Sequence, residues 1–150
     1  MEGLFMPEVK EADIKELAVG QSCTTVNMVS EADIVKFSEV TGDVNPIHLD
    51  VAYAKRSVFG ERIAHGMISA GYISAIFGTR FPGPGSIYLS QSLKFKAPVR
   101  IGDSVESTVT ITELNEKRGR VTLDCICRVG EVIVLTGEAR LMVPGRPKQV

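Results

Sequence analysis

An uncharged run from Gly66 to Thr79 constrains the fold more than any other feature of the chain. It is shorter than the roughly 20 apolar residues that cross a bilayer. Its small residues, among them Gly71 and Ala75, allow close packing on several sides. The run therefore predicts a helix buried on all sides, and other elements must cover it.

The second half of the chain has the pattern of a sheet that could cover this helix. Apolar residues alternate there with polar ones, as in strands with one buried face. The segments 115–120 and 128–132 are short enough for hairpin connections, which favours antiparallel pairing. Residues 21–29 can add a further strand, at the edge or beside the last one. The predicted class is α+β, one curved antiparallel sheet around a central helix. The residues expected inside are Ile87, Leu89, Leu93 and Phe95; Val105, Val109 and Ile111; Val121, Leu123, Cys125 and Cys127; and Ile133, Leu135, Ala139, Leu141 and Val143.

Composition limits the partners. A chain of 150 residues, 44% of them hydrophobic, is about the size of one domain. The net charge is −1 and the basic residues are scattered, which argues against nucleic acid as a partner. We expect no membrane partner. The three cysteines suit reduced thiols better than a disulfide framework or a zinc site, and no signal peptide is recognisable, so the expected location is the cytoplasm.

The loop "TGDVNPIHLD" is the first candidate for function. It follows a helix that should begin after Ser30 and end at Gly42. Asp43 and His48 lie five residues apart around Pro46, which bends the chain. Asp43 could be a helix cap and His48 an ordinary surface or core histidine. The alternative is an acid–base pair on a rigid loop.

Features of the uncharged helix favour the acid–base alternative. Gly66 opens this helix, whose free N–H groups can bind a developing negative charge. Ser74 lies further along it and could orient a carboxylate, or bond back to its own helix. The neighbouring His65 is expected to be structural. A base, its partner and an oxyanion donor together indicate chemistry beside a carbonyl.

Three segments carry a resemblance to a known family. The stretches "FSEVTGDVNPIHLDVAYA", "RIAHGM" and "GPGSIYLSQSLKFKAPVRIGD" resemble the MaoC-like (R)-specific enoyl-CoA hydratases and 3-hydroxyacyl-thioester dehydratases, which have the hot-dog fold. The resemblance runs from about Val19 to about Val143. It implies a single domain over residues 19–150 preceded by an extension over residues 1–18.

The resemblance also implies roles for individual residues. Asp43 and His48 match the catalytic pair, and Gly66 matches the N–H that binds the thioester oxygen. Asn45 matches a position that shapes the loop at the substrate, and Ser74 matches a hydroxyl near the carboxylate. The implied reaction is the reversible hydration of a trans-2-enoyl-CoA to an (R)-3-hydroxyacyl-CoA. It needs no metal and no cofactor beyond the coenzyme A of the substrate.

Alternatives to this activity remain open. The chain could be a 3-hydroxyacyl-[acyl-carrier-protein] dehydratase, or a non-catalytic subunit that binds acyl thioesters. The resemblance implies a homodimer or a multiple of one. Ile73 and Phe77 follow Gly66 at close to whole turns of the helix, so we expect them along the acyl chain as substrate-binding residues. This geometry predicts a preference for enoyl groups of about four to six carbons.

Overall fold

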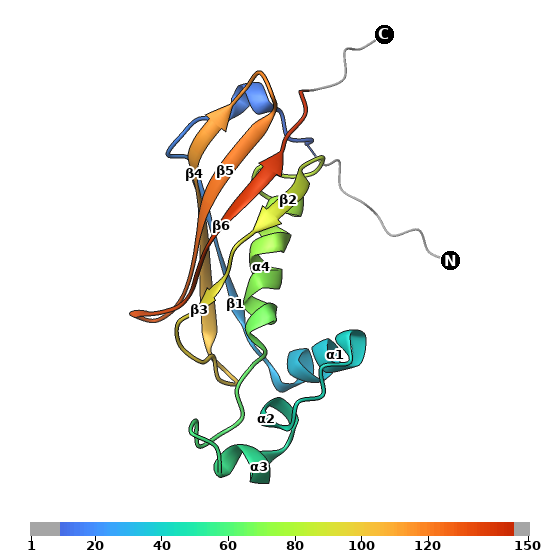
Figure 1. The fold of residues 1–150 in the computed structure, drawn as a ribbon, viewed down its shortest axis with the longest axis vertical. Helices are drawn as coiled ribbons and strands as arrows, with labels where there is room; N and C mark the ends of the chain where they lie inside the picture. Colours follow the sequence, from blue (N-terminus) through green and yellow to red (C-terminus); the bar gives the residue numbers. More distant parts are fainter. Residues whose placement is uncertain (1–9, 146–150) are drawn as a thin grey trace, which may run out of the picture.

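Six antiparallel strands form a sheet that curves along one side of a central helix in the computed structural model, which describes residues 10–145 (Figure 1). The strand order is β1-β4-β5-β6-β2, and the short β3 also pairs with β6. The fold class predicted from the sequence is confirmed. The strands are β1 (Ser22–Met28), β2 (Ile87–Gln91), β3 (Lys94–Phe95), β4 (Ser104–Asn115), β5 (Arg120–Val129) and β6 (Val132–Met142).

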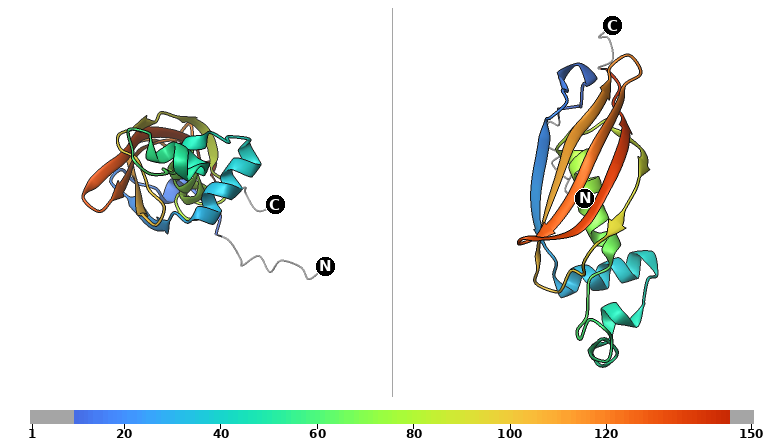
Figure 2. Two further views of the ribbon diagram at one scale, coloured as in Figure 1. Left: turned by 90° about the horizontal axis from the view of Figure 1, so that it is seen from below. Right: turned by 60° about the vertical axis from the view of Figure 1, so that its left-hand side comes forward.

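The helices divide into two groups. The central helix is α4 (Gly66–Thr79), which runs along the sheet. The other α-helices, α1 (Glu31–Thr41), α2 (Pro46–Leu49) and α3 (Val51–Lys55), gather beyond one end of the sheet, near the start of α4 (Figures 1 and 2). A single 3-10 turn, η1 (Ile14–Glu16), precedes β1. The candidate loop therefore lies where the two groups meet.

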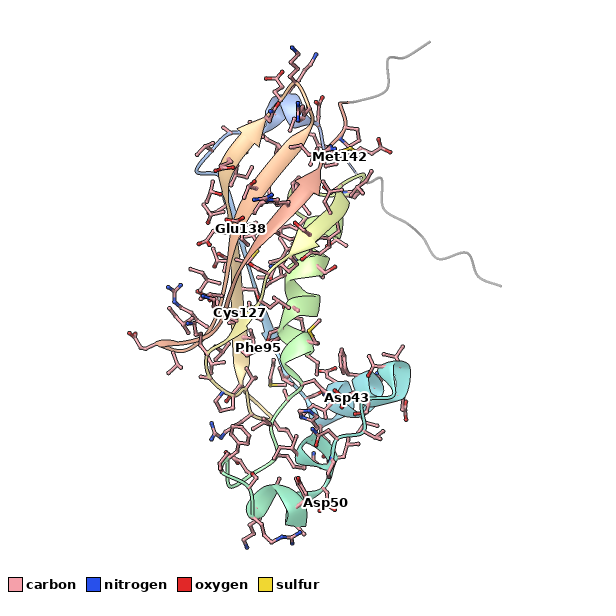
Figure 3. The ribbon with its side chains drawn as sticks, viewed as in Figure 1. Asp43, Asp50, Phe95, Cys127, Glu138 and Met142 are labelled. Carbon is pink, nitrogen blue, oxygen red and sulfur yellow. The ribbon has the colours of Figure 1, made fainter. Side chains whose placement is uncertain are left out.

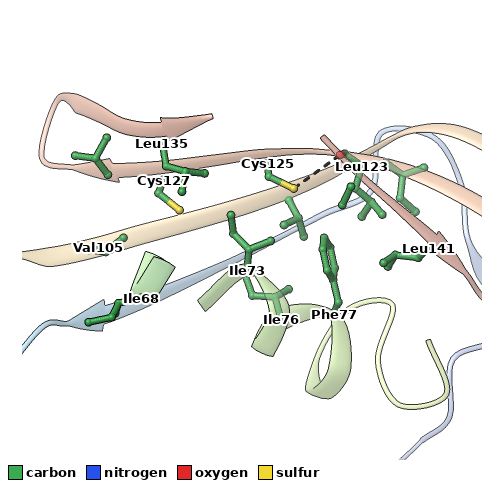
Figure 4. Close-up of a cluster of buried hydrophobic side chains, with 14 of the residues drawn as sticks. Ile68, Ile73, Ile76, Phe77, Val105, Leu123, Cys125, Cys127, Leu135 and Leu141 are labelled. Atoms are coloured by element: carbon green, nitrogen blue, oxygen red, sulfur yellow. Dashed lines mark hydrogen bonds between the residues drawn. The ribbon is translucent and has the colours of Figure 1, made fainter. Parts of the chain in front are cut away.

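In the long strands, the apolar residues that alternate with polar ones face inward and form the core, as predicted. The inward residues of β4 and β5 are almost fully buried, and Figure 4 shows Leu123 and Cys125 facing Ile73 and Phe77 of α4. Ile133 departs from the prediction because it is exposed, whereas both Val134 and Leu135 are buried. A register irregularity at the β5–β6 hairpin, between Cys127 and Arg128, accounts for this change of face.

Two predictions of burial, that of the whole central helix and that of one face of the segment 87–95, are wrong for the single chain. One face of α4 is open, with Met67, Gly71 and Ser74 exposed. In the segment 87–95, Ile87 and Leu89 are exposed on β2, an edge strand with a neighbour on one side only, and Phe95 is exposed on the short β3. Periodicity showed which residues share a face, but not whether the same chain covers that face.

Local signals at the helix ends are confirmed. Ser30 forms a reciprocal capping box with Asp33 at the start of α1. Gly42 ends that helix in the left-handed region, at φ 77°. The predicted loop is shorter than expected, because Pro46 begins the helical turn α2 and Asn45 caps it.

The remaining predictions concern the N-terminus and the cysteines. Of the extension predicted over residues 1–18, residues 1–9 lie outside the described part. Ala12 and Ile14, in its described part, pack into the core. Cys125 and Cys127 are buried free thiols, and burial raises the pKa of Cys125 to about 12. Within residues 10–145, no helix has the length and apolar character needed to cross a membrane.

Candidate active site

The loop after α1 is shaped by hydrogen bonds from its own side chains. The Asp43 backbone N–H donates to Thr41 Oγ1 at 3.1 Å. The Asn45 N–H donates to Asp43 Oδ1 at 3.3 Å, and the Ile47 N–H donates to Asn45 Oδ1 at 3.2 Å. These are local turns of the kind that Asp, Asn and Thr form. The side chains of the loop itself therefore determine its shape. Asp43 lies near the start of α4 (Figure 3).

His48 is held as a neutral imidazole with one free nitrogen. Only 8% of the residue is exposed, and its Nδ1 lies 2.8 Å from the Ile63 carbonyl oxygen. Because a carbonyl only accepts, Nδ1 carries the proton and Nε2 keeps a lone pair. Burial lowers the pKa of His48 below its usual 6.5, and the charge of His65 adds to this; the Ile63 hydrogen bond and Asp43 oppose it. The free Nε2 can accept a proton.

Asp43, His48 and His65 form one cluster. Atoms of these side chains that could bind a metal lie within 4.8 Å of one another. The two imidazole rings are stacked, with centroids 3.9 Å apart and planes at 28°. Such a group can hold a water molecule in reach of both a carboxylate and an imidazole, and the same atoms could bind a divalent cation.

The start of α4 supplies hydrogen-bond donors next to this cluster. Within residues 10–145 no side chain caps this helix, and the Ile68 N–H donates to the His65 carbonyl oxygen at 3.1 Å. The N–H groups of Gly66 and Met67, which precede it, are the donors that the start of the helix offers. A Cβ on Gly66 would lie 2.6 Å from two atoms of the Phe95 ring. Glycine therefore keeps backbone and ring close together, and the helix N-terminus is suited to an anionic oxygen.

Two cavities meet at the start of α4. The first, which we call the His48 cavity, has a volume of about 400 Å³ and includes Gly66 and Phe95 in its lining. The second, the Asp43 cavity, measures about 780 Å³ and includes Ser74 and Tyr88. Met67 lines both. A bound molecule could therefore extend in two directions from the cluster.

The structure brings most of the predicted site residues together. Asp43, His48 and Gly66 meet where the cavities join, and Ser74 shares the cavity of Asp43. Asn45 instead uses its side-chain oxygen to cap α2.

Ile73 and Phe77 lie elsewhere than predicted. Both are almost fully buried in the core under the sheet and line neither cavity (Figure 4). They lie on the side of α4 that packs against the sheet, where they are surrounded by other core side chains. Phe77 meets the Asp43 cavity only indirectly, since its ring packs edge-on against Tyr88 at 5.4 Å between centroids.

Sequence reasoning missed several residues around the cluster. Ser38 is buried and lies 3.1 Å, Oγ to Nε2, from His65. A serine one helical turn after the buried Ile34 was a signal that could have been used. The Ile63 carbonyl and the positions of Met67 and Phe95 had no signal, because they depend on packing between distant segments.

Comparison with known proteins agrees with this geometry. The family model described as "MaoC like domain" matches residues 14–128. An (R)-specific enoyl-CoA hydratase of Rhodospirillum rubrum is 54% identical over 89% of this chain and 91% of that protein. A 3-hydroxybutyryl-CoA dehydratase of Methylorubrum extorquens is 50% identical over 93% of this chain and 89% of that protein.

A solved structure gives the same result for the fold. The unliganded R-hydratase of Pseudomonas aeruginosa superposes with a TM-score of 0.87 at 40% identity, covering 92% of this chain and 89% of that one. The chain therefore belongs to the MaoC-like family and has its hot-dog fold.

Proposed function

We propose that the protein catalyses the reversible addition of water to a trans-2-enoyl-CoA, giving an (R)-3-hydroxyacyl-CoA. The observation that carries this proposal is the meeting of Asp43, neutral His48 and the uncapped start of α4 at one point. The names of the relatives at 50% and 54% identity support the same reaction and a coenzyme A substrate.

In this proposal the thioester oxygen accepts a hydrogen bond from the Gly66 N–H. Hydration at C3 places negative charge on that oxygen as the enolate forms. A donor at the end of a helix stabilises this charge more than it stabilises the neutral substrate. The acyl and pantetheine parts then extend from the cluster into the two cavities.

The acid–base pair handles one proton. Asp43 and His48 bind the attacking water, and the pair accepts a proton as the water oxygen bonds to C3. The same proton then goes to C2, so the product gains one water and the pair returns to its starting state. Because the two groups titrate together, the proton belongs to the pair rather than to either residue.

The decisive experiment follows loss of enoyl absorbance with purified protein and crotonyl-CoA, then with crotonyl-acyl carrier protein. We expect turnover of the coenzyme A ester and product of the R configuration. A much higher kcat/KM on the carrier protein would instead indicate the dehydratase of fatty-acid synthesis. Absence of turnover with both would leave the non-catalytic subunit, although the assembled cluster argues against it.

The pH dependence should reflect a base that stays neutral at pH 7. Burial lowers the pKa of His48 below 6.5, so the active form persists as the pH falls to that value. We expect little change in kcat/KM for crotonyl-CoA between about pH 8 and 7.5, and a decrease at lower pH whose midpoint lies below 6.5. The acid limb of the profile measures the apparent pKa of the pair. A midpoint above 7 would contradict this assignment.

We also propose that a second copy covers the open face of α4. The exposed small residues Gly71, Ser74 and Ala75 lie on this helix, and Tyr88 and Leu89 of the edge strand β2 line the same Asp43 cavity as Gly71 and Ser74. An uncharged face beside an unpaired strand edge invites association. The Asp43 cavity would then lie at the interface of a homodimer.

Placing an arginine in this face should break the dimer. A Cβ at Gly71 would meet no atom of residues 10–145 within 4 Å, so Gly71→Arg should fold but leave a buried charge in the interface. We expect light scattering to give the mass of two chains for wild type and of one for the variant. Gly145→Arg, also in open space, is the matched control. An active wild-type monomer would refute the dimer.

A preference for short acyl groups forms the last part of the proposal. The Phe77 ring packs against the ring of Tyr88, and Tyr88 lines the Asp43 cavity. Phe77→Ala should allow the Tyr88 ring to move back, which enlarges the Asp43 cavity and raises kcat/KM for octenoyl-CoA relative to crotonyl-CoA. The substitution should also lower the free energy of unfolding by about 3–5 kcal/mol. Ile76→Ala, at a buried position that lines neither cavity, controls for the stability loss. An unchanged ratio would exclude Phe77 as a limit on chain length.

A further inference from the structure

His65 occupies the centre of the candidate site, although its own atoms line neither cavity. It is 3% exposed and lies immediately before Gly66 in the chain. Its ring packs against Phe37 at 4.6 Å between centroids and stacks on His48 at 3.9 Å. A buried imidazole needs hydrogen-bond partners, and those of His65 come from the loop of Asp43 and from α1.

The hydrogen bonds of His65 determine its tautomer. Its Nε2 lies 3.1 Å from the Asp43 backbone oxygen and 3.1 Å from Ser38 Oγ. Because the carbonyl only accepts, Nε2 carries the proton, and the serine oxygen can share it. The buried Nδ1 has no hydrogen-bond partner in the described structure, so a second proton there would be unpaired.

These contacts connect the three functional parts of the site. The Nε2–H bond fixes the backbone of Asp43, the stacked ring limits the orientation of His48, and the peptide bond continues to Gly66. Ser38 holds the same nitrogen from α1. A displacement of His65 would disturb the base, its partner and the oxyanion donor together.

We propose that His65, held by Ser38, is a positioning residue that keeps Asp43, His48 and Gly66 in one catalytic geometry. This inference rests on the proposed hydration. It assigns His65 no proton transfer to substrate. Misplacement of reacting groups by about 1 Å can cost about 100-fold in rate, which sets the scale of the expected effect.

The titratable groups that face His65 are Asp43 and His48. His65 lowers the pKa of His48, an effect smaller than that of burial, whereas Asp43 raises it. Replacing His65 by a neutral amide removes that contribution and the stacked ring. The acid limb of kcat/KM should then move to higher pH, a change that loss of stability alone would not produce.

Three variants test the proposal. His65→Phe keeps a ring but loses both hydrogen bonds, and we expect kcat to decrease at least about tenfold with little change in KM. His65→Gln can place an N–H near the position of Nε2, and it should recover part of kcat while moving the acid limb upward. Ser38→Ala should lower kcat by a smaller factor. Ser107→Ala removes another buried hydroxyl, in β4, and serves as the matched control.

An independent readout does not require activity. The chain has only two histidines, so ¹⁵N-histidine NMR reports His48 and His65 separately. We expect protonated Nε2 on His65 and protonated Nδ1 on His48 in wild type, and a higher His48 pKa in His65→Gln. If wild type shows these tautomers but does not hydrate crotonyl-CoA, the proposed function fails while the hydrogen-bond network stands. If wild type is active and the His65 variants keep its kcat, KM and pH profile, the positioning role is refuted.

Discussion

Replacing Asp43 by Asn is expected to lower kcat/KM for crotonyl-CoA by about 10²- to 10⁴-fold, the contribution typical of a positioned acid–base group. Asparagine keeps the shape of the side chain and can still accept the loop hydrogen bond from the Asn45 N–H. It cannot accept a proton from water. His48→Ala should cause a loss of similar size, because it removes the free Nε2 that shares the proton.

The control for this experiment lies on the same segment. Asp50 caps α3 by accepting from the Tyr53 N–H, and it lines neither cavity. Asn caps helices about as well as Asp, so Asp50→Asn should keep both activity and stability. Circular dichroism checks that all variants are folded. More than about a tenth of wild-type turnover in a folded Asp43→Asn or His48→Ala variant would rule out the proposed roles.

A large loss of stability is expected from Gly137→Ala in β6. A Cβ at this position would lie 2.0 Å from the backbone oxygen of Ser92, where the chain passes from β2 to β3. That oxygen belongs to a segment tied to β6 by the bond from the Ser92 N–H to the Glu138 oxygen, at 2.9 Å. A backbone atom cannot relieve the clash by rotating to another rotamer, as a side chain can. We therefore expect the free energy of unfolding to decrease by about 3 kcal/mol or more.

Thermal unfolding measures this effect, with a decrease in Tm of about 10 °C expected for a chain of this size. Gly78→Ala is the matched control, because an added Cβ meets nothing within 4 Å and alanine favours a helix by up to about 1 kcal/mol. Gly66→Ala should be milder than Gly137→Ala, since the exposed Phe95 ring can rotate away. A Tm for Gly137→Ala within about 2 °C of wild type would contradict the clash.

Much of the site could be predicted because it depends on neighbours in the chain. Thr41, Asp43 and Asn45 shape their loop through bonds to backbone N–H groups only two residues away. Ser30 and Gly42 fix the ends of α1 in the same local way. These hydrogen bonds do not depend on the rest of the fold. The loop that carries Asp43 and His48 could therefore be predicted from the sequence alone.

The protonation and the hydrogen-bond partners of the two histidines could not be predicted from the sequence, because they depend on segments far apart in the chain. The proton of His48 is placed by the carbonyl of Ile63, which has no side-chain signal, and His65 is held by Ser38 of another helix. Burial then lowers the pKa of His48. Each of these contacts requires the end of α1, α2 and the start of α4 to be packed together.

The sequence by itself determined the elements and their inward faces: the uncharged helix, the alternating strands around Leu123 and Cys125, and the loop that carries Asp43 and His48. Only the tertiary structure decided what each face meets. Ile73 and Phe77 were expected along the acyl chain but fill the core under the sheet, and another face of α4 remains open. The physical reason is that periodicity follows from the geometry of one helix or strand, whereas contact depends on where the others pack.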